Sequence, residues 1–215
     1  MPILKSQSPD TKTRIMEVAF ELFGKEGFEG TSVRDIAKLS GSNIAGVNYH
    51  FKSKENLYWE VMAATFMEVH YAIQKLSVDA KNTKDLAMKT YDYFLTEKTA
   101  VRSIMKMMLT DLKPPQDLDK EIYDILLSPM GPPGGEFLAE SLVKEIPYPL
   151  SKEGIMWGVK SIFSVIHHWG VLFTCHCLVD NQDPMMSEVQ IRADVESMLD
   201  SHLLYLMNNK EKFKA

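Results

Sequence analysis

Three neighbouring stretches decide the fold of this chain: TSVRDIA at residues 31–37, SGSNIAGVNYHF at residues 40–51 and KSKENL at residues 52–57. The first contains Ser32-Val-Arg-Asp35, a capping-box pattern in which Ser32 accepts from a backbone N–H at the start of a short helix and Asp35 reaches back. Gly41 is expected to end that helix. A further short helix is expected from about Asn43 to Tyr49.

An amphipathic helix precedes these stretches, from about Thr11 to Gly24. Its apolar residues share one face at helical spacing, and they are Ile15, Val18, Ala19, Leu22 and Phe23. Asp10 or Thr11 can cap its start, and Gly24 and Gly27 are expected to end it. Three short helices in close succession, with a Gly at the second turn, are typical of a helix-turn-helix.

A long helix is expected next, because Ser53 can cap a helical run from Lys54 to about Val78. The residues that we assign to the core of this region are Ile36, Ala37, Phe51 and Leu57. Within the third short helix, Ile44 and Val47 are also candidate core positions.

The rest of the chain has helical periodicity and no alternating strand pattern. Helices are expected at about 83–98, 99–112, 117–127, 136–145, 151–177 and 187–208, the last opened by the capping box Ser187-Glu-Val-Gln190. An all-α fold is therefore the only reasonable class. We expect an N-terminal three-helix domain at residues 1–56, joined by the long helix to a C-terminal helical ligand-binding and dimerisation domain at residues 57–215.

Composition and charge fit an ordinary globular chain, with 45% hydrophobic residues, 25% charged residues and a net charge of −5. Residues 1–56 carry 8 Lys and Arg against 7 Asp and Glu, so they are net positive by one, whereas the remainder is net negative. Affinity for nucleic acid would therefore be local to the N-terminal part.

Residues 161–179 lack Asp, Glu, Lys and Arg and reach the length of a membrane span. Their three histidines, and the lack of flanking basic and aromatic anchors, favour a buried central helix and no membrane association. Cys175 and Cys177 diverge on a helix and are not expected to form a disulfide. Because residues 1–10 also lack the apolar core of a signal peptide, we expect a cytoplasmic protein.

In detail, residues 31–57 closely resemble the DNA-binding signature of the tetracycline-repressor (TetR) family of transcription regulators, and the resemblance covers roughly Thr11 to Val61. It implies that the third helix is a recognition helix that lies in the major groove of DNA. The implied base-reading and phosphate-binding residues are Thr31, Ser42, Asn43, Ile44, Ala45, Gly46, Asn48, Tyr49, His50 and Lys54. Asn48 stands where many members have Tyr, and its amide suits bidentate pairing with adenine.

Some of these residues also have structural interpretations, which stay open at this point. Tyr49 can pack at a helix end, and His50 can cap helix carbonyls. Gly46 costs about 1 kcal/mol relative to Ala inside a helix, which close approach to DNA or to another helix would explain.

The resemblance also implies a homodimer in which the last two helices form a four-helix bundle with a second copy. A two-fold dimer places two recognition helices ~34–36 Å apart, on a pseudo-palindromic operator. The apolar residues of the last helix that we assign to dimerisation are Ile191, Val195, Met198, Leu199, Tyr205 and Leu206.

Met and aromatic residues of the C-terminal part predict a pocket for an apolar small-molecule effector, or alternatively only core. The candidates are Met105, Met108, Tyr123, Trp157, Phe163, His167 and Phe173. His167, His168 and the Cys-His-Cys run at residues 175–177 suggest a metal site, but four tetrahedral ligands do not converge at these spacings. We therefore predict no metal and no cofactor.

The sequence thus predicts a DNA-binding transcriptional regulator, a repressor released from its operator by a small apolar or aromatic ligand. The alternative is a dimeric DNA-binding regulator controlled by a protein partner, without a small-molecule effector. An enzyme is not expected, since no Ser-His-Asp order, metal-ligand cluster or Gly-rich phosphate loop supports one.

Overall fold

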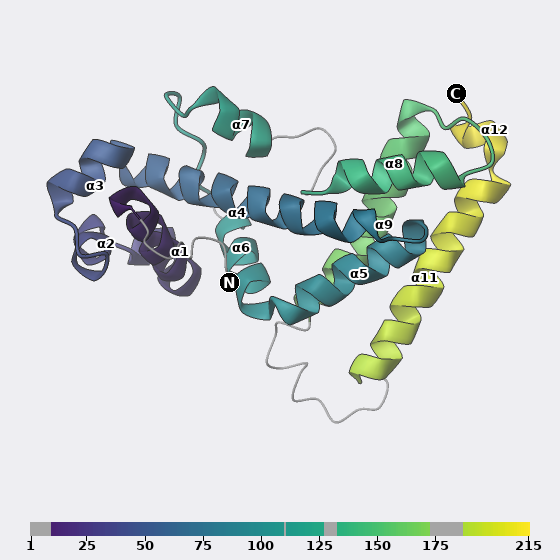
Figure 1. The fold of residues 1–215 in the computed structure, drawn as a ribbon, viewed down its shortest axis with the longest axis horizontal. Helices are drawn as coiled ribbons and strands as arrows, with labels where there is room; N and C mark the ends of the chain where they lie inside the picture. Colours follow the sequence, from purple (N-terminus) through teal and green to yellow (C-terminus); the bar gives the residue numbers. More distant parts are fainter. Residues whose placement is uncertain (1–9, 110, 127–132, 173–186) are drawn as a thin grey trace. The chain divides into compact units, whose positions relative to one another are not determined.

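The computed structural model describes residues 10–109, 111–126, 133–172 and 187–215 (Figure 1). Its helices are α1 (Thr11–Gly30), α2 (Val33–Leu39), α3 (Ile44–Phe51), α4 (Lys54–Val78), α5 (Thr83–Thr96), α6 (Lys98–Met108), α7 (Lys120–Leu126), α8 (Gly135–Glu145), α9 (Lys152–Leu172), α11 (Glu188–Asn208) and α12 (Lys210–Phe213). Within these ranges the pairing of extended backbone is limited to an isolated bridge between Leu150 and Lys214. The predicted all-α class is confirmed.

The chain divides into two compact units. The first unit comprises Met1–Glu68 and Thr99–Ser128, and the second comprises Val69–Lys98 and Pro129–Ala215. Helix α4 begins in the first unit and ends in the second. The expected domain boundary between residues 56 and 57 stays a prediction.

Helix α1 begins where expected but continues further. Asp10 caps it, because its carboxylate accepts from the Thr13 N–H at 2.7 Å. The expected break at Gly27 is confirmed, since its φ of 77° interrupts the helix before it resumes as far as Gly30, whereas the expected end at Gly24 is wrong. Gly24 is instead required by packing, since a Cβ there would lie 2.7 Å from the Cβ of Ser103 in α6.

Local capping sets the starts of the next helices. The Asp35 N–H donates to the Ser32 hydroxyl at 3.1 Å, and that hydroxyl donates in turn to the Asp35 carboxylate. The Asn56 N–H donates to Ser53 at 3.1 Å, so α4 has the predicted bounds. Ser187 likewise accepts from the Gln190 N–H at 3.2 Å at the start of α11.

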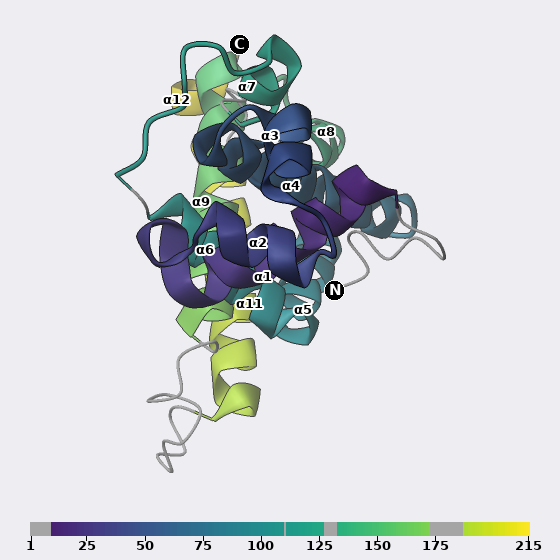
Figure 2. The ribbon, with the colours of Figure 1, turned by 90° about the vertical axis from the view of Figure 1, so that its left-hand side faces the viewer.

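The core of the first unit lies where α1, α2 and α3 gather around the start of α4 (Figures 1 and 2). The predicted core residues are buried there, namely Ile36, Ala37, Val47, Phe51 and Leu57. The aromatic ring of Tyr58 packs edge-on against Phe23 at 4.9 Å between ring centres. The core assignment of Ile44 is wrong, because it lies on the outer face of the first turn of α3 and is 44% exposed.

In the second unit α9 packs against α5, α8 and α11, and α11 runs beside α9 (Figure 1). The Arg192 guanidinium of α11 bonds the Asp92 carboxylate of α5 through both of its terminal nitrogens. The short helix α12 was not predicted. The helix expected at 151–177 is described as far as Leu172, so Cys175 and Cys177 lie outside the described residues.

Several other boundaries differ by a few residues. Helix α6 ends at Met108 rather than near residue 112, and α7 begins at Lys120 rather than near residue 117. Among the described helices, we find none that combines the length and apolar character needed to cross a membrane.

Candidate nucleic-acid interface

Helix α3 has two contrasting faces. Val47 and Phe51 are 2% and 1% exposed and anchor it to the first unit. The residues exposed on its outer side are Ile44, Ala45, Asn48 and Tyr49, which we call the α3 strip. Residues four apart lie above one another on a helix, so Ile44 and Asn48 form one row along this side and Ala45 and Tyr49 form a second row next to it. Residues 40–51 contain no Asp, Glu, Lys or Arg, so the strip is uncharged.

The turn before α3 fixes its direction. Gly41 has a φ of 68°, a left-handed value that glycine adopts without steric cost. The Ser42 N–H then donates to the Ala37 carbonyl at 2.9 Å. Asn43 caps α3 by accepting from the Gly46 N–H at 2.7 Å. This cap uses the side-chain oxygen of Asn43, so its NH2 group is the part that can donate outward.

The turn after α3 is tight. Lys52 has a φ of 62° and a ψ of −48°, and the Ser53 N–H donates across it to the Phe51 carbonyl at 2.7 Å. This γ-turn is strained for a residue other than glycine. It connects α3 to α4 within two residues and leaves the Lys52 side chain exposed.

Exposed cations flank the α3 strip in the chain. Arg34 and Lys38 are four residues apart on the exposed side of α2, and Lys52 follows α3 directly. In protein–DNA complexes cations that contact phosphates orient the protein, while uncharged contacts to base edges supply specificity. These three residues were missed from the sequence, although the burial expected for Ile36 and Ala37 already placed Arg34 and Lys38 outside.

Lys54 and Thr31 hold the connection between α1 and α2. The Lys54 ammonium donates to the carbonyls of Phe28 at 2.9 Å and Thr31 at 3.0 Å, and it lies 4.0 Å from the centre of the Phe28 ring. The hydroxyl of Thr31, a residue only 3% exposed, donates to the Gly27 carbonyl at 2.8 Å. An ammonium has three N–H donors, so one donor of Lys54 is left for a phosphate.

The end of α3 carries the two ring residues of the predicted site. Tyr49 is 84% exposed, so packing in the core does not account for it. Its ring meets that of His50 edge-on at 5.3 Å, and His50 is half-buried. A phenol hydroxyl in this position is free to reach a phosphate or a base edge.

Comparison with known proteins identifies this arrangement. The family model described as bacterial regulatory proteins, tetR family, matches residues 15–61, which run from the first buried residue of α1 through α3 and into α4. Residues 15–61 therefore match the DNA-binding region of the TetR family.

Curated TetR-like relatives match the N-terminal part of the chain. The probable HTH-type transcriptional regulator YttP of Bacillus subtilis is 47% identical over 58 residues, which are 27% of this chain and 28% of YttP. The regulator QacR of Staphylococcus aureus is 47% identical over 51 residues, 24% and 27% of the two chains. The repressor NicS of Pseudomonas putida is 30% identical over 93 residues, 41% and 44%. The matches span less than half the length of each relative.

Solved structures share the fold over most of the chain. A transcriptional regulator from Rhodococcus sp. RHA1 has a TM-score of 0.64 at 20% identity, covering 90% of this chain and 98% of its own. The regulator FadR from Bacillus subtilis, in complex with stearoyl-CoA, has a TM-score of 0.60 at 16% identity, covering 91% and 97%. At these identities the likeness extends to the fold alone.

The residues predicted for dimerisation divide between two faces of α11. Four are buried among the chain's own helices, namely Ile191, Val195, Leu199 and Leu206. Met198 and Tyr205 are 39% and 42% exposed, and Leu204 beside them is 56% exposed. The exposed group is the part of α11 that can meet a second chain.

The predicted pocket residues lie in several places. Phe163 and His167 are adjacent on α9, and Phe94 of α5 lies 5.1 Å from His167 between ring centres. Burial lowers the pKa of His167 below its ordinary value. Trp157, earlier on α9, packs instead against Phe213 with tilted rings, 5.0 Å apart between ring centres. Met105, Met108 and Tyr123 belong to the first unit, and Phe173 lies outside the described residues.

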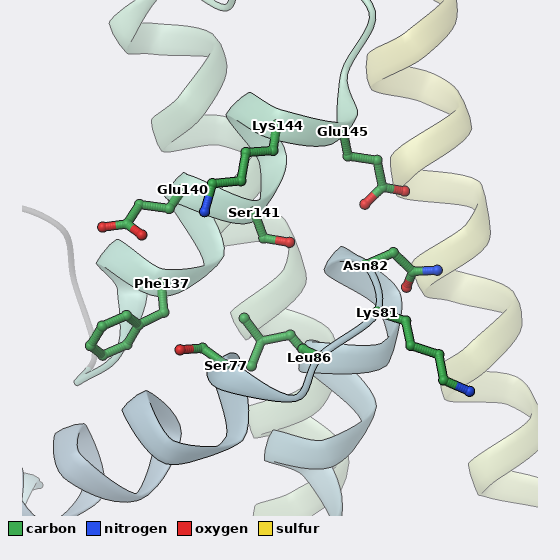
Figure 3. A pocket seen from close by; sticks show the side chains of 10 residues that line it. Ser77, Lys81, Asn82, Leu86, Phe137, Glu140, Ser141, Lys144 and Glu145 are labelled. Carbon is green, nitrogen blue, oxygen red and sulfur yellow. The ribbon is translucent and has the colours of Figure 1, made fainter.

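The second unit also has an open hollow of about 310 Å³, where the α4–α5 connection faces α8 (Figure 3). Its lining is largely polar and includes Ser77, Lys81, Asn82, Glu140, Ser141 and Lys144. The Thr83 N–H donates to the Glu145 carboxylate at 2.8 Å, which joins α5 to α8 beside it. None of the predicted pocket residues lines this hollow.

Within the described part of the chain, no three His, Cys, Asp or Glu side chains come together as a metal site would require. The run Cys175-His176-Cys177 lies outside that part.

Proposed function

We propose that this chain is a homodimeric transcriptional repressor of the TetR family that binds a pseudo-palindromic operator through α3. The observation that carries the proposal is the exposed, uncharged α3 strip with cations before and after it in the chain. A helix fits the major groove, where base edges present donors, acceptors and methyl groups. Because bacterial DNA lies in the cytoplasm, the proposed function places the chain there.

Dimerisation follows from the size of the reading element. Helix α3 spans eight residues, so one copy reaches few base pairs. A two-fold dimer doubles the contacts and places the two helices one DNA turn apart. The exposed apolar side chains of α11 support such an interface. The names of NicS, a repressor, and IcaR, a negative regulator, support repression.

We further propose release by a small apolar or aromatic ligand. The buried side chains of Phe94 and Phe163 and the half-buried His167 form an apolar cluster in the second unit into which such a ligand would insert, and the solved FadR structure holds stearoyl-CoA. Helix α4 is one uninterrupted element that contributes to both units, so it can transmit a change between them. The ligand must bind one dimer conformation more tightly than the other, since equal affinity shifts nothing.

Control by a protein partner is the second candidate. It is favoured by the hollow beside α8, which is polar and open rather than enclosed and apolar. A regulator of this kind would bind the same operator but would not respond to small apolar molecules.

Selection of duplexes from a random-sequence library by the purified protein tests DNA binding. We expect an inverted repeat to be enriched, with an affinity that falls as salt rises because phosphate contacts release counterions. Enrichment of no duplex would contradict the proposal. A panel of apolar and aromatic compounds, added to the enriched duplex in fluorescence anisotropy, tests release, and operator affinity that no compound changes would favour the protein-partner mechanism.

A further inference from the structure

The α3 strip combines two aliphatic side chains and one amide with the phenol of Tyr49 at its C-terminal end. Ile44 and Ala45 lie in the first turn of α3, and both are exposed. Asn48 lies one turn after Ile44 on the same side of the helix, because residues four apart are neighbours on a helix surface. The surface that would enter a groove is therefore aliphatic at its N-terminal end and amide-bearing one turn later.

Each base pair presents its own pattern of hydrogen-bond donors, acceptors and methyl groups in the major groove. Guanine is read most often by Arg or Lys, which bond to O6 and N7, and the N4 amine of cytosine is read by Asp or Glu. None of these four residue types occurs in residues 40–51. Arg34, Lys38 and Lys52 precede or follow α3, where cations suit phosphates rather than base edges.

The pairings that remain for these side chains both fall on A·T pairs. An Asn amide bonds adenine through N6 and N7, and aliphatic side chains contact the C5-methyl group of thymine. We infer that each half-site of the operator carries thymines facing Ile44 and Ala45 and an adenine facing Asn48. This inference rests on the proposed function and names the base pairs that it reads.

Replacement of thymidine by deoxyuridine tests the methyl contacts, because uracil differs from thymine only by lacking the C5-methyl group. The probe is the duplex most enriched from a random library by the wild-type protein. A buried methyl group contributes about fourfold in affinity. Replacing one contacted thymine in each half-site should therefore weaken binding about 16-fold. Ile44→Ala keeps the core intact, and this variant should lose the penalty at its own thymine.

The amide contact has a matching test. Substituting 7-deazaadenine removes the N7 acceptor, so it should weaken binding by the wild-type protein about tenfold, as expected for part of a bidentate pair. Asn48→Ala should bind the modified and unmodified duplexes equally. A gain of function completes the set, since Ile44→Arg introduces the guanine-reading side chain and should enrich G at the facing position.

The outcomes separate this inference from the proposed function. If sequence-selective binding persists while deoxyuridine leaves the affinity unchanged, or if the enriched half-site has G·C pairs facing α3, the inference is wrong and the proposed function stands. If no duplex is enriched at any salt concentration, the proposed function fails and the inference falls with it.

Discussion

Lys54 is the predicted DNA-binding residue whose contacts most clearly also stabilise the fold. Lys54→Met keeps an unbranched side chain but removes the ammonium that lies over the Phe28 ring and donates to the Phe28 and Thr31 carbonyls. The Phe28 carbonyl still accepts from the Thr31 N–H at 3.3 Å. The Thr31 carbonyl, in a residue only 3% exposed, loses the Lys54 donor at 3.0 Å.

These contacts set the size of the effect. A hydrogen bond from a charged donor contributes about 1.5–3 kcal/mol, and leaving a buried acceptor unpaired costs about 1–3 kcal/mol. A cation over an exposed aromatic ring adds about 0.5–1 kcal/mol. Because Lys54 is only half-buried, water replaces part of what is lost. We expect Lys54→Met to lower the free energy of unfolding by about 2–3 kcal/mol in urea denaturation followed by circular dichroism.

Lys52→Met is the matched control, two residues away, because the Lys52 side chain is exposed. It should change stability by less than about 0.5 kcal/mol. Each variant should lower the slope of log affinity against log salt by about 1.8 if its lysine contacts one phosphate in each half of the dimer, which is about 0.9 per contact. If Lys54→Met unfolds at the same urea concentration as Lys52→Met and loses only DNA affinity, the stabilising role of Lys54 is refuted.

Three further changes test other parts of the structure. Gly24→Ala should destabilise the protein by about 1–3 kcal/mol in urea, because its Cβ would meet Ser103, and Gly24→Ala with Ser103→Gly should recover part of the loss; no recovery would contradict the α1–α6 contact. Burial lowers the pKa of His167, so the unfolded chain binds that proton more readily and stability should fall as pH drops below about 6.5. His167→Phe should remove this part of the pH dependence of the unfolding midpoint, and an unchanged dependence would exclude His167 as its source. Ser32→Ala should cost about 1 kcal/mol through loss of the α2 cap, whereas the exposed Ser197→Ala should be neutral in the same measurement.

Features set by neighbouring residues could be predicted from the sequence. Ser32, Ser53 and Ser187 each accept from an N–H three residues later, so the starts of α2, α4 and α11 are encoded locally. The burial of Val47 and Phe51 on α3 likewise followed from helical spacing. These signals require no knowledge of which helices meet.

Features that depend on distant residues could not be predicted. Gly24 looked like a helix end, because nothing near it in the sequence indicates that Ser103 packs against it. The carbonyls that bind Lys54 come from Phe28 and Thr31 in an earlier turn. The apolar residues of α11 have similar chemistry, so only packing separates the buried Leu199 from the exposed Leu204.

Hydroxyl-radical footprinting of the wild-type protein on its enriched duplex tests most directly whether α3 enters the DNA groove. We expect two protected segments whose centres lie ~10–10.5 base pairs, or a multiple of this, apart. Asn48→Asp places a carboxylate on the exposed side of α3 and should abolish the protection, whereas Gln74→Glu, the same charge change at an exposed position of α4, should leave it intact. Protection that survives Asn48→Asp unchanged would show that another surface of the protein contacts the DNA.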